Sequence, residues 1–261
     1  MIPALVSISF RALEVPAILT LARQAGLQAI EWGGDIHCPH GDCDIAHSVA
    51  QQTHAAELSV CAYGSYYRLG VSEAAGLSFA DVVASAAALA APRIRVWAGA
   101  TGSAQTSPTQ RQAIIQDARR CADLAAARGI RVVSEWHGGT ITDNAASGRA
   151  FLEDVAHPAF GIIWQPSVGL DADAALAEFS AVAPWIEHLH VFNWQVYERL
   201  PLADGADRWR RYFAAAAALN RPLHAALEFV RQDAPQQLLA DGMTLNTLLA
   251  SHPSTPPNRP S

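Results

Sequence analysis

The 261-residue sequence contains no lysine, so all 18 of its basic residues are arginine. Schiff-base chemistry, pyridoxal phosphate catalysis and phosphate transfer at a P-loop each need a lysine amine in a defined position. The missing side chain therefore excludes these three classes of enzyme.

Charge and long apolar runs are also scarce. Charged residues make up 16% of the sequence and hydrophobic residues 51%, with a formal net charge of −6, which is typical of a compact soluble protein with a large core. Because there is no basic run, nucleic acid and membrane surfaces are not expected as partners. The first residues lack a secretory signal and Asp81 interrupts the most apolar stretch, so we expect a cytoplasmic protein.

The cysteines form no recognisable framework. Paired spacing is absent among all four, which are Cys38, Cys43, Cys61 and Cys121. Two of them lie near His37 and His40, but a single loop cluster without a second set of ligands is not typical of a structural zinc site.

Short runs rich in valine, isoleucine and aromatic residues alternate eight times with longer, alanine-rich stretches of helical periodicity. This alternation predicts a single α/β domain, a (β/α)₈ TIM barrel. The expected strands are 5–10, 27–32, 58–64, 93–98, 130–136, 160–164, 186–192 and 223–230. A doubly wound sheet, the main alternative, needs a glycine-rich turn after its first strand, and residues 9–12 offer none.

The barrel is expected to occupy residues 1–251 and to end in a helix at 234–250. Residues 252–261 are rich in proline, and we expect them to form a disordered tail. Gly26 and Gly129 stand where helices should end before the next strand.

Active sites of such barrels lie at the carboxyl ends of the strands. The last four expected strands each end near a polar group: Glu135, Gln165, His190 and Glu228. Two carboxylates, an imidazole and an amide oxygen suit a divalent cation such as Mn²⁺, Mg²⁺, Co²⁺ or Zn²⁺. We therefore predict that these four residues bind one metal ion. The alternatives are a solvated glutamate in a loop and, for Gln165, a side chain that only donates and accepts hydrogen bonds.

Neighbouring residues extend the predicted site. His137 lies on the same strand face as Glu135 and is a candidate substrate contact. Arg199, just beyond the seventh strand, could bind a substrate oxygen or phosphate, although an exposed ion pair is the alternative. His188 and His224 fall one layer deeper in the barrel, where we expect core histidines.

Tryptophans crowd the same end of the barrel. Five fall at or just after expected strand ends: Trp32, Trp97, Trp136, Trp164 and Trp194. Flat rings beside carboxylates are typical of carbohydrate sites. Some must pack against helices instead, because alternation turns Trp164 away if Gln165 points inward.

From Ser7 to Phe229 the sequence resembles the xylose isomerase-like barrel superfamily of sugar isomerases, epimerases and endonuclease IV-type repair enzymes. The segments that carry the resemblance are 30–37, 135–139, 190–193 and 227–228. It implies a divalent metal held by Glu135, His190 and Glu228, with Gln165 in place of the family's aspartate. Trp32 and His37, in the first segment, are assigned to substrate binding.

Differences from the family pattern reduce the number of family activities that this sequence could have. Gln165 removes one negative charge, which should weaken metal binding, and Ser167 and Val168 stand where the family often has a histidine. The absent lysine argues against aldose isomerisation of the xylose isomerase type. A repair endonuclease would need further histidine and aspartate ligands on strands three and four, which end in Tyr63-Gly64 and Trp97-Ala98.

The leading hypothesis is a metal-assisted isomerase or epimerase of a keto-sugar or a polyol-derived ketone. Glu135 and Glu228 would remove and return a proton on opposite faces of one carbon, through an enediolate. Two alternatives remain: a sugar or inositol dehydratase that uses the same site, and a non-catalytic sugar- or metal-binding barrel. The substrate, the metal and a possible homo-oligomeric state stay open.

Overall fold

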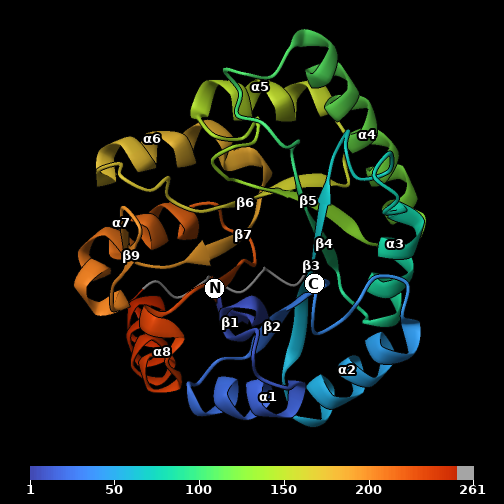
Figure 1. The fold of residues 1–261 in the computed structure, drawn as a ribbon. Helices are drawn as coiled ribbons and strands as arrows, with labels where there is room; N and C mark the ends of the chain where they lie inside the picture. Colours follow the sequence, from blue (N-terminus) through green and yellow to red (C-terminus); the bar gives the residue numbers. More distant parts are fainter. Residues whose placement is uncertain (252–261) are drawn as a thin grey trace, which may run out of the picture.

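Eight parallel strands form a closed barrel in the computed structural model, which describes residues 1–251 (Figure 1). The barrel strands are β1 (Ile2–Val6), β2 (Ala29–Gly33), β3 (Ser59–Arg68), β4 (Arg93–Trp97), β5 (Arg131–Glu135), β6 (Phe160–Trp164), β7 (Ile186–Val191) and β10 (His224–Leu227). Parallel pairing of β1 with β10 closes the ring. The predicted (β/α)₈ barrel is confirmed, and the expected tail at 252–261 lies outside the described residues.

A ring of helices covers the outside of the barrel (Figure 1). They are α1 (Val15–Gln24), α2 (Cys43–Ala55), α3 (Phe79–Ala88), α4 (Pro108–Ala126), α5 (Ala145–Val155), α6 (Ala172–Val182), α7 (Ala206–Ala217) and α8 (Pro235–Ala250). At the start of α4, the side chains of Ser107 and Gln110 bond reciprocally to each other's backbone N–H groups. Gly26 and Gly129 follow α1 and α4 with φ near +71°, the left-handed conformation expected there.

The interior of the barrel differs from the layer between barrel and helices. Aromatic and aliphatic side chains fill the outer layer, as where Trp164 packs edge-on against Phe179 and Tyr212. Inside the barrel, small side chains such as Ala4, Ala29 and Ala226 form a separate cluster. Small residues leave space beside them for large polar groups. The barrel can therefore enclose charged side chains under the mouth formed by the strand ends.

The first strand ends earlier than the sequence predicts. It stops at Val6, and Ser7–Phe10 form a short 3₁₀ helix. The hydroxyl of Ser7 accepts a hydrogen bond from the Gly33 N–H at 2.9 Å, and that of Ser9 accepts one from the Phe229 N–H, also at 2.9 Å. These side-chain bonds compete with the strand ladder and turn the chain.

The third and eighth barrel strands also differ from their expected bounds. β3 continues to Arg68, with a shift in its register against β4 between Gly64 and Tyr67. β10 ends at Leu227, and Phe229 adopts a φ of +55°. A left-handed turn directly after Glu228 is incompatible with a continuing strand. The turn leaves Glu228 just beyond the strand end, at the mouth.

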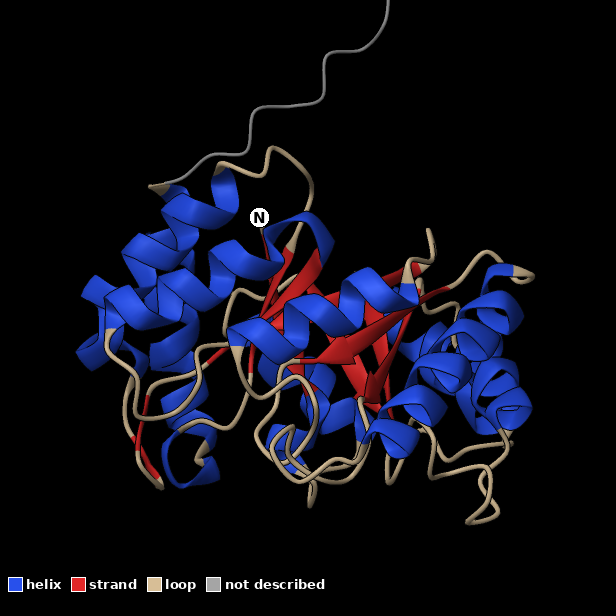
Figure 2. Cartoon of the chain, turned by 90° about the horizontal axis from the view of Figure 1, so that it is seen from above, coloured by secondary structure: helices blue, strands red, loops and turns tan. Residues whose placement is uncertain are grey.

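Sequence reasoning did not foresee a short hairpin after β7. It consists of β8 (Trp194–Gln195) and β9 (Glu198–Arg199), which pair antiparallel. Figure 2 shows this pair among the loops at the end of the molecule opposite the amino terminus. These loops surround the mouth of the barrel.

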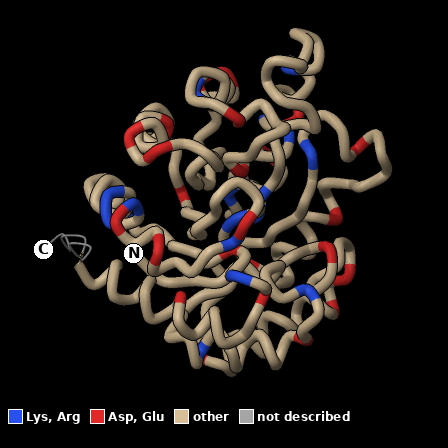
Figure 3. Tube along the Cα trace, turned by 60° about the vertical axis from the view of Figure 1, so that its left-hand side comes forward, with Lys and Arg blue, Asp and Glu red and all other residues tan. Residues whose placement is uncertain are grey.

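Figure 3 shows arginines interspersed with acidic residues along the part of the chain that the structure describes. None of the helices within residues 1–251 combines the length and apolar character needed to cross a membrane.

Candidate active site

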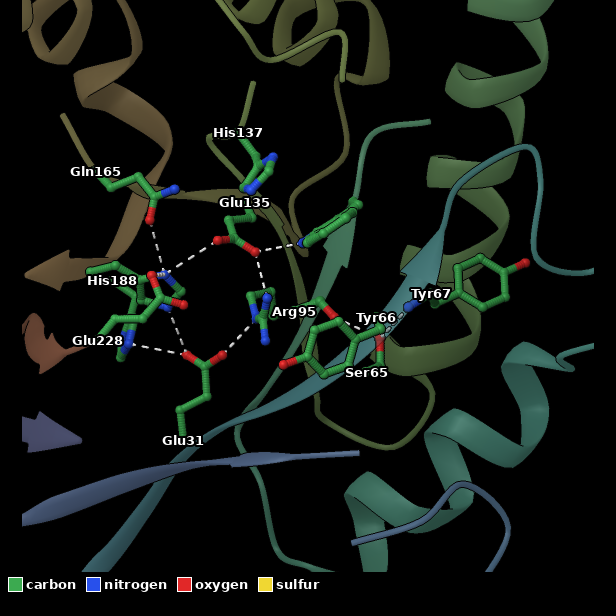
Figure 4. A network of polar contacts seen from close by, with 12 residues as sticks. Glu31, Ser65, Tyr66, Tyr67, Arg95, Glu135, His137, Gln165, His188 and Glu228 are labelled. Atoms are coloured by element: carbon green, nitrogen blue, oxygen red, sulfur yellow. Dashed lines mark hydrogen bonds and ion pairs between the residues drawn. The ribbon is translucent and has the colours of Figure 1, made fainter. Parts of the chain in front are cut away.

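The four predicted metal ligands converge at the mouth of the barrel. The His190 Nδ1 atom lies 3.5 Å from Glu135 Oε1, 3.4 Å from Glu228 Oε2 and 3.2 Å from Gln165 Oε1. All four side chains are buried. Because β5, β6, β7 and β10 are consecutive neighbours in the barrel, residues at their carboxyl ends meet on one side of the mouth (Figure 4).

The ring of His190 is oriented from below. Its Nε2 atom lies 3.1 Å from Glu31 Oε2 in the fully buried interior. A carboxylate accepts the Nε2–H, so Nδ1 is the ring nitrogen that faces the three oxygens. Metal-binding histidines are commonly fixed in this way by a carboxylate on the other ring nitrogen.

Two charged residues that the sequence analysis did not single out complete the site. Arg95 is 2% exposed and donates from Nε to Glu31 Oε1 at 2.6 Å and from Nη1 to Glu135 Oε2 at 2.5 Å. The Trp97 indole N–H donates to the same Glu135 oxygen at 2.6 Å. Glu135 thus has one oxygen held by two donors, and its other oxygen faces His190. We call Glu31, Arg95, Glu135, His190 and Glu228 the polar floor.

Glu31 and Arg95 were missed because only the strand ends were searched. Both lie within strands, one layer further in, where an unpaired charge is too costly to be retained. The signal was present as a glutamate in β2 and an arginine in β4, each among apolar neighbours. Gly64 makes room for the pair, because a Cβ atom there would lie 2.6 Å from Arg95 Nη2 and 3.1 Å from Glu31 Oε1.

Electrostatics favour a cation among these groups. Burial raises the pKa of Glu31 and of Glu135, but attraction to Arg95 and interactions with His190 together outweigh it, so both pKa values lie below their usual range. Burial lowers the pKa of His190, yet the carboxylates of Glu228 and Glu31 outweigh it and hold that pKa well above normal. One arginine faces three carboxylates, so a protonated His190 or a bound cation offsets the excess negative charge.

The deeper histidines behave differently. Burial lowers the pKa of His188 to about 4 and that of His224 to about 3. Both rings are therefore neutral at neutral pH. Their positions inside the barrel match the expectation of core histidines, with His188 Nε2 lying 3.3 Å from Glu31 Oε2.

The donor set fits a divalent metal ion. Glu135, His190 and Glu228 each offer one ligand atom within 4.8 Å of the others, and the Gln165 amide oxygen lies beside them. A single imidazole nitrogen carries at most one proton, so it cannot satisfy three surrounding oxygens. Within residues 1–251, two clusters of side chains could hold a metal ion. Both clusters lie in the barrel, and neither contains a cysteine.

His137 lines the cavity above this set. Its ring stacks on Trp97 with centroids 4.6 Å apart and planes 21° from parallel. Its Nδ1 atom lies 2.5 Å from the carbonyl oxygen of Gly138. A carbonyl only accepts, so Nδ1 carries the hydrogen and the neutral ring keeps its lone pair on Nε2. The stack and this bond restrain both the orientation and the tautomer.

Three residues assigned to substrate binding lie elsewhere. Trp32 is fully buried and donates to Thr53 at 3.1 Å, and His37 is 6% exposed and bonded to Ser7 at 3.0 Å. Arg199 forms an ion pair with Asp233, which was the alternative to substrate binding for this residue. None of the three lines the cavity, so we do not retain them as proposed substrate contacts.

The cavity at the mouth has a volume of about 700 Å³. Its inner end is lined by Arg95, Glu135 and Glu228 of the polar floor and by Gln165 beside them. Of the five tryptophans near the strand ends, Trp97, Trp136 and Trp194 line it. Trp164 faces the helices instead, as alternation indicated.

Residues 19–245 match the family model described as xylose isomerase-like TIM barrel. A segment of 107 residues is 34% identical to a 3-dehydroshikimate dehydratase of Bacillus anthracis, and covers 39% of this chain and 36% of that protein. The chain therefore matches only about a third of that curated relative.

Solved structures share the fold over nearly the whole chain. The probable 3-DHS dehydratase involved in petrobactin synthesis in Bacillus anthracis superposes with a TM-score of 0.76 at 21% identity, covering 94% of this chain and 99% of that one. The D-psicose 3-epimerase of Clostridium cellulolyticum H10, solved with D-tagatose, gives 0.72 at 13% identity, covering 96% and 99%. At these identities the similarity concerns the fold, and both dehydratases and epimerases are found on it. Together with the matched family model, the barrel identifies this chain as a member of the xylose isomerase-like TIM barrel family.

Proposed function

We propose that this chain removes water from a β-hydroxy ketone that carries further hydroxyl groups, by first taking the proton from the carbon beside the carbonyl. The observation that carries the proposal is the unequal environment of the two predicted catalytic carboxylates. Arg95 and Trp97 both donate to Glu135, whereas Glu228 has neither of these donors.

The inequality disfavours a symmetric exchange of protons between Glu135 and Glu228. A carboxylate whose pKa is lowered by an adjacent arginine is a weak base, because proton transfer is efficient when the pKa of the group is near the working pH. Glu135 therefore serves better as a fixed anion than as a proton carrier. Another group at the cavity must accept the proton.

His137 is suited to that role. Its Nε2 lone pair is free, because Nδ1–H is held by the Gly138 carbonyl, and its ring stacks on Trp97. The imidazole takes the proton from the α-carbon, and the C–H electron pair becomes the enolate. The imidazolium then returns the proton to the hydroxyl that leaves from the β-carbon. The products are an unsaturated ketone and one water molecule.

Glu135, Gln165, His190 and Glu228 are the residues that would hold a divalent cation. The cation would supply a Lewis acid for the substrate's carbonyl oxygen and so favour the enolate. Arg95 keeps Glu135 ionised and in place, and Glu31 keeps the His190 lone pair directed to the mouth. The buried position of these groups strengthens their electrostatic effect on the substrate.

The sequence match to a 3-dehydroshikimate dehydratase gives separate support. Epimerisation or isomerisation of a ketose, the leading hypothesis from the sequence, is the second candidate. It is favoured by the approach of Glu135 and Glu228 to the same His190 nitrogen, at 3.5 and 3.4 Å. If both carboxylates moved protons, the carbon beside the carbonyl of a bound ketose would be inverted, or the carbonyl would move to that carbon.

Product analysis separates the candidates. The chain loaded with Mn²⁺ would be incubated in ²H₂O with 3-dehydroshikimate and, separately, with a panel of ketoses, and the products followed by mass spectrometry. We expect the loss of one water from a β-hydroxy ketone. Deuterium in a recovered ketose without loss of water would favour the epimerase. Binding of these compounds without either change would contradict both enzymes and favour a binding protein.

A further inference from the structure

The cavity is larger than the reacting part of the proposed substrate needs. Its volume of about 700 Å³ falls within the range of about 300–1,000 Å³ that proteins use for drug-sized ligands. A single polyhydroxylated ring placed at the polar floor would occupy only the inner part. The outer part is space in the cavity that the proposed reaction does not account for.

The outer part is lined by apolar and aromatic side chains from two loops. We call the set Val168, Phe192, Trp194, Val196 and Tyr197 the outer subsite. Three of its members are well exposed: Tyr197 at 93%, Val196 at 60% and Val168 at 47%. Exposed apolar groups gathered at the rim of a cavity mark a site of contact with a ligand or partner.

The hairpin that carries most of the outer subsite is anchored. The Trp194 ring lies 5.4 Å from that of Phe192 and 5.8 Å from that of Phe229. The guanidinium of Arg199 lies 4.4 Å from the centre of the Phe229 ring and pairs with Asp233. These contacts hold β8 and β9 beside the cavity. Because the base of the hairpin is packed in this way, its tip extends into solvent.

The outer subsite has a different chemistry from the floor. Valine and phenylalanine side chains have no hydrogen-bonding groups, and aromatic rings present flat faces that pair with other rings or with C–H surfaces. A hydroxyl-rich substituent would lose its contacts with water there without replacement. An apolar or aromatic group would gain from burial.

We propose that the outer subsite binds an apolar, preferably aromatic, substituent attached to the polyhydroxylated ring whose ketone lies at the polar floor. The substrate class is then a ring ketone bearing an aryl or alkyl group, rather than a free monosaccharide. The inference rests on the proposed function for the position of the ketone. Recognition of the substituent, however, requires no turnover.

The test compares two non-reacting probes, methyl β-D-glucopyranoside and phenyl β-D-glucopyranoside. Calorimetric titration of the full chain loaded with Mn²⁺ should show phenyl glucoside binding at least about tenfold more tightly, since a buried phenyl ring removes much apolar surface from water. In Tyr197→Ala with Val168→Ala, the preference should fall to about threefold or less, with methyl glucoside binding unchanged. Met243→Ala is the control, because Met243 is 72% exposed on α8 and does not line the cavity.

Equal affinity for the two glucosides, or no detectable binding of either, would overturn the proposal. A preference that survives the double substitution would also overturn it. If Tyr197→Ala instead converts a dimer to a monomer in sedimentation, with no preference for phenyl glucoside in the parent, the rim is a contact between copies of the chain. Phenyl preference without any dehydration of ketones would leave the outer subsite standing and contradict only the proposed reaction.

Discussion

The polar floor and the outer subsite occupy one cavity but are built in opposite ways. Most of the floor lies on barrel strands, where Arg95 is 2% exposed and bonded to two carboxylates. The outer subsite lies on loops, where Tyr197 is 93% exposed. Strands fix side chains more rigidly than loops do, and loops vary more freely. Under the proposed function, the polar floor would determine the type of reaction and the outer subsite would determine the substrate.

Loss of the proposed base should have the largest effect. In His137→Gln, we expect kcat to fall by about 10²- to 10⁴-fold, because the amide cannot accept the α-proton. Mn²⁺ affinity should stay as in the parent, since His137 is not among the four predicted ligands. The measurement is steady-state kinetics beside a metal titration. Full activity in the variant would mean that another group, Glu228 first, accepts the proton.

Removal of the floor's arginine should cost stability. Arg95→Met leaves Glu31 and Glu135 buried without their cation, and breaking such a pair costs about 3–5 kcal/mol in the free energy of unfolding. Urea denaturation measures this. The matched control is Arg23→Met, whose exposed ion pair with Glu57 should contribute about 1 kcal/mol or less. Similar losses in the two variants would contradict the distinction between a buried network and a solvated surface.

A substitution of Gln165 tests whether this residue, beside the polar floor, binds the metal ion or the substrate. Gln165→Asp restores a third carboxylate to the ligand set and should tighten Mn²⁺ binding by about 10- to 100-fold. If Gln165 instead donates its amide N–H to the substrate, the variant will bind metal as the parent does and substrate less well. Calorimetric titrations of both proteins with metal and with a ketone distinguish the two roles.

The pH dependence of metal binding follows from the raised pKa of His190. In the metal-free chain His190 keeps its proton through neutral pH, so a metal ion must displace that proton. Affinity should therefore rise with pH, by up to about tenfold per unit between about pH 6 and 8. Glu135 does not add to this trend, because its pKa is lowered. An affinity that does not change with pH would show that His190 is not a ligand.

The barrel and the four converging residues could be predicted from the sequence because both depend on repeated local patterns. Eight apolar runs with capped helices between them specify the fold, and parallel strands bring their carboxyl ends together without knowledge of any long-range contact. The strand ends themselves were less predictable. Ser7 and Ser9 terminate β1 by bonding to Gly33 and Phe229, and those partners become known only after folding.

Contacts between residues distant in the sequence explain both the site residues that the sequence did not predict and those that it predicted in the wrong place. Arg95 contacts Glu31 and Glu135, which lie 64 and 40 positions away in the sequence, so a local pattern can mark a charge among apolar neighbours but not the contacts between the charges. Trp32 and Arg199 were placed at the site by proximity to strand ends. The structure directs the first toward Thr53 and the second toward Asp233. Which way a side chain at a strand end points depends on a register that the sequence sets only approximately.

The measurement that tests the central claim most directly is Mn²⁺ stoichiometry in the parent chain and in Glu228→Gln, determined by elemental analysis after dialysis. A cation held jointly by Glu135, Gln165, His190 and Glu228 predicts about one ion per chain in the parent and a clear loss in the variant. A stoichiometry near zero in the parent, or an unchanged value in Glu228→Gln, would contradict the metal site and with it the proposed chemistry of the floor.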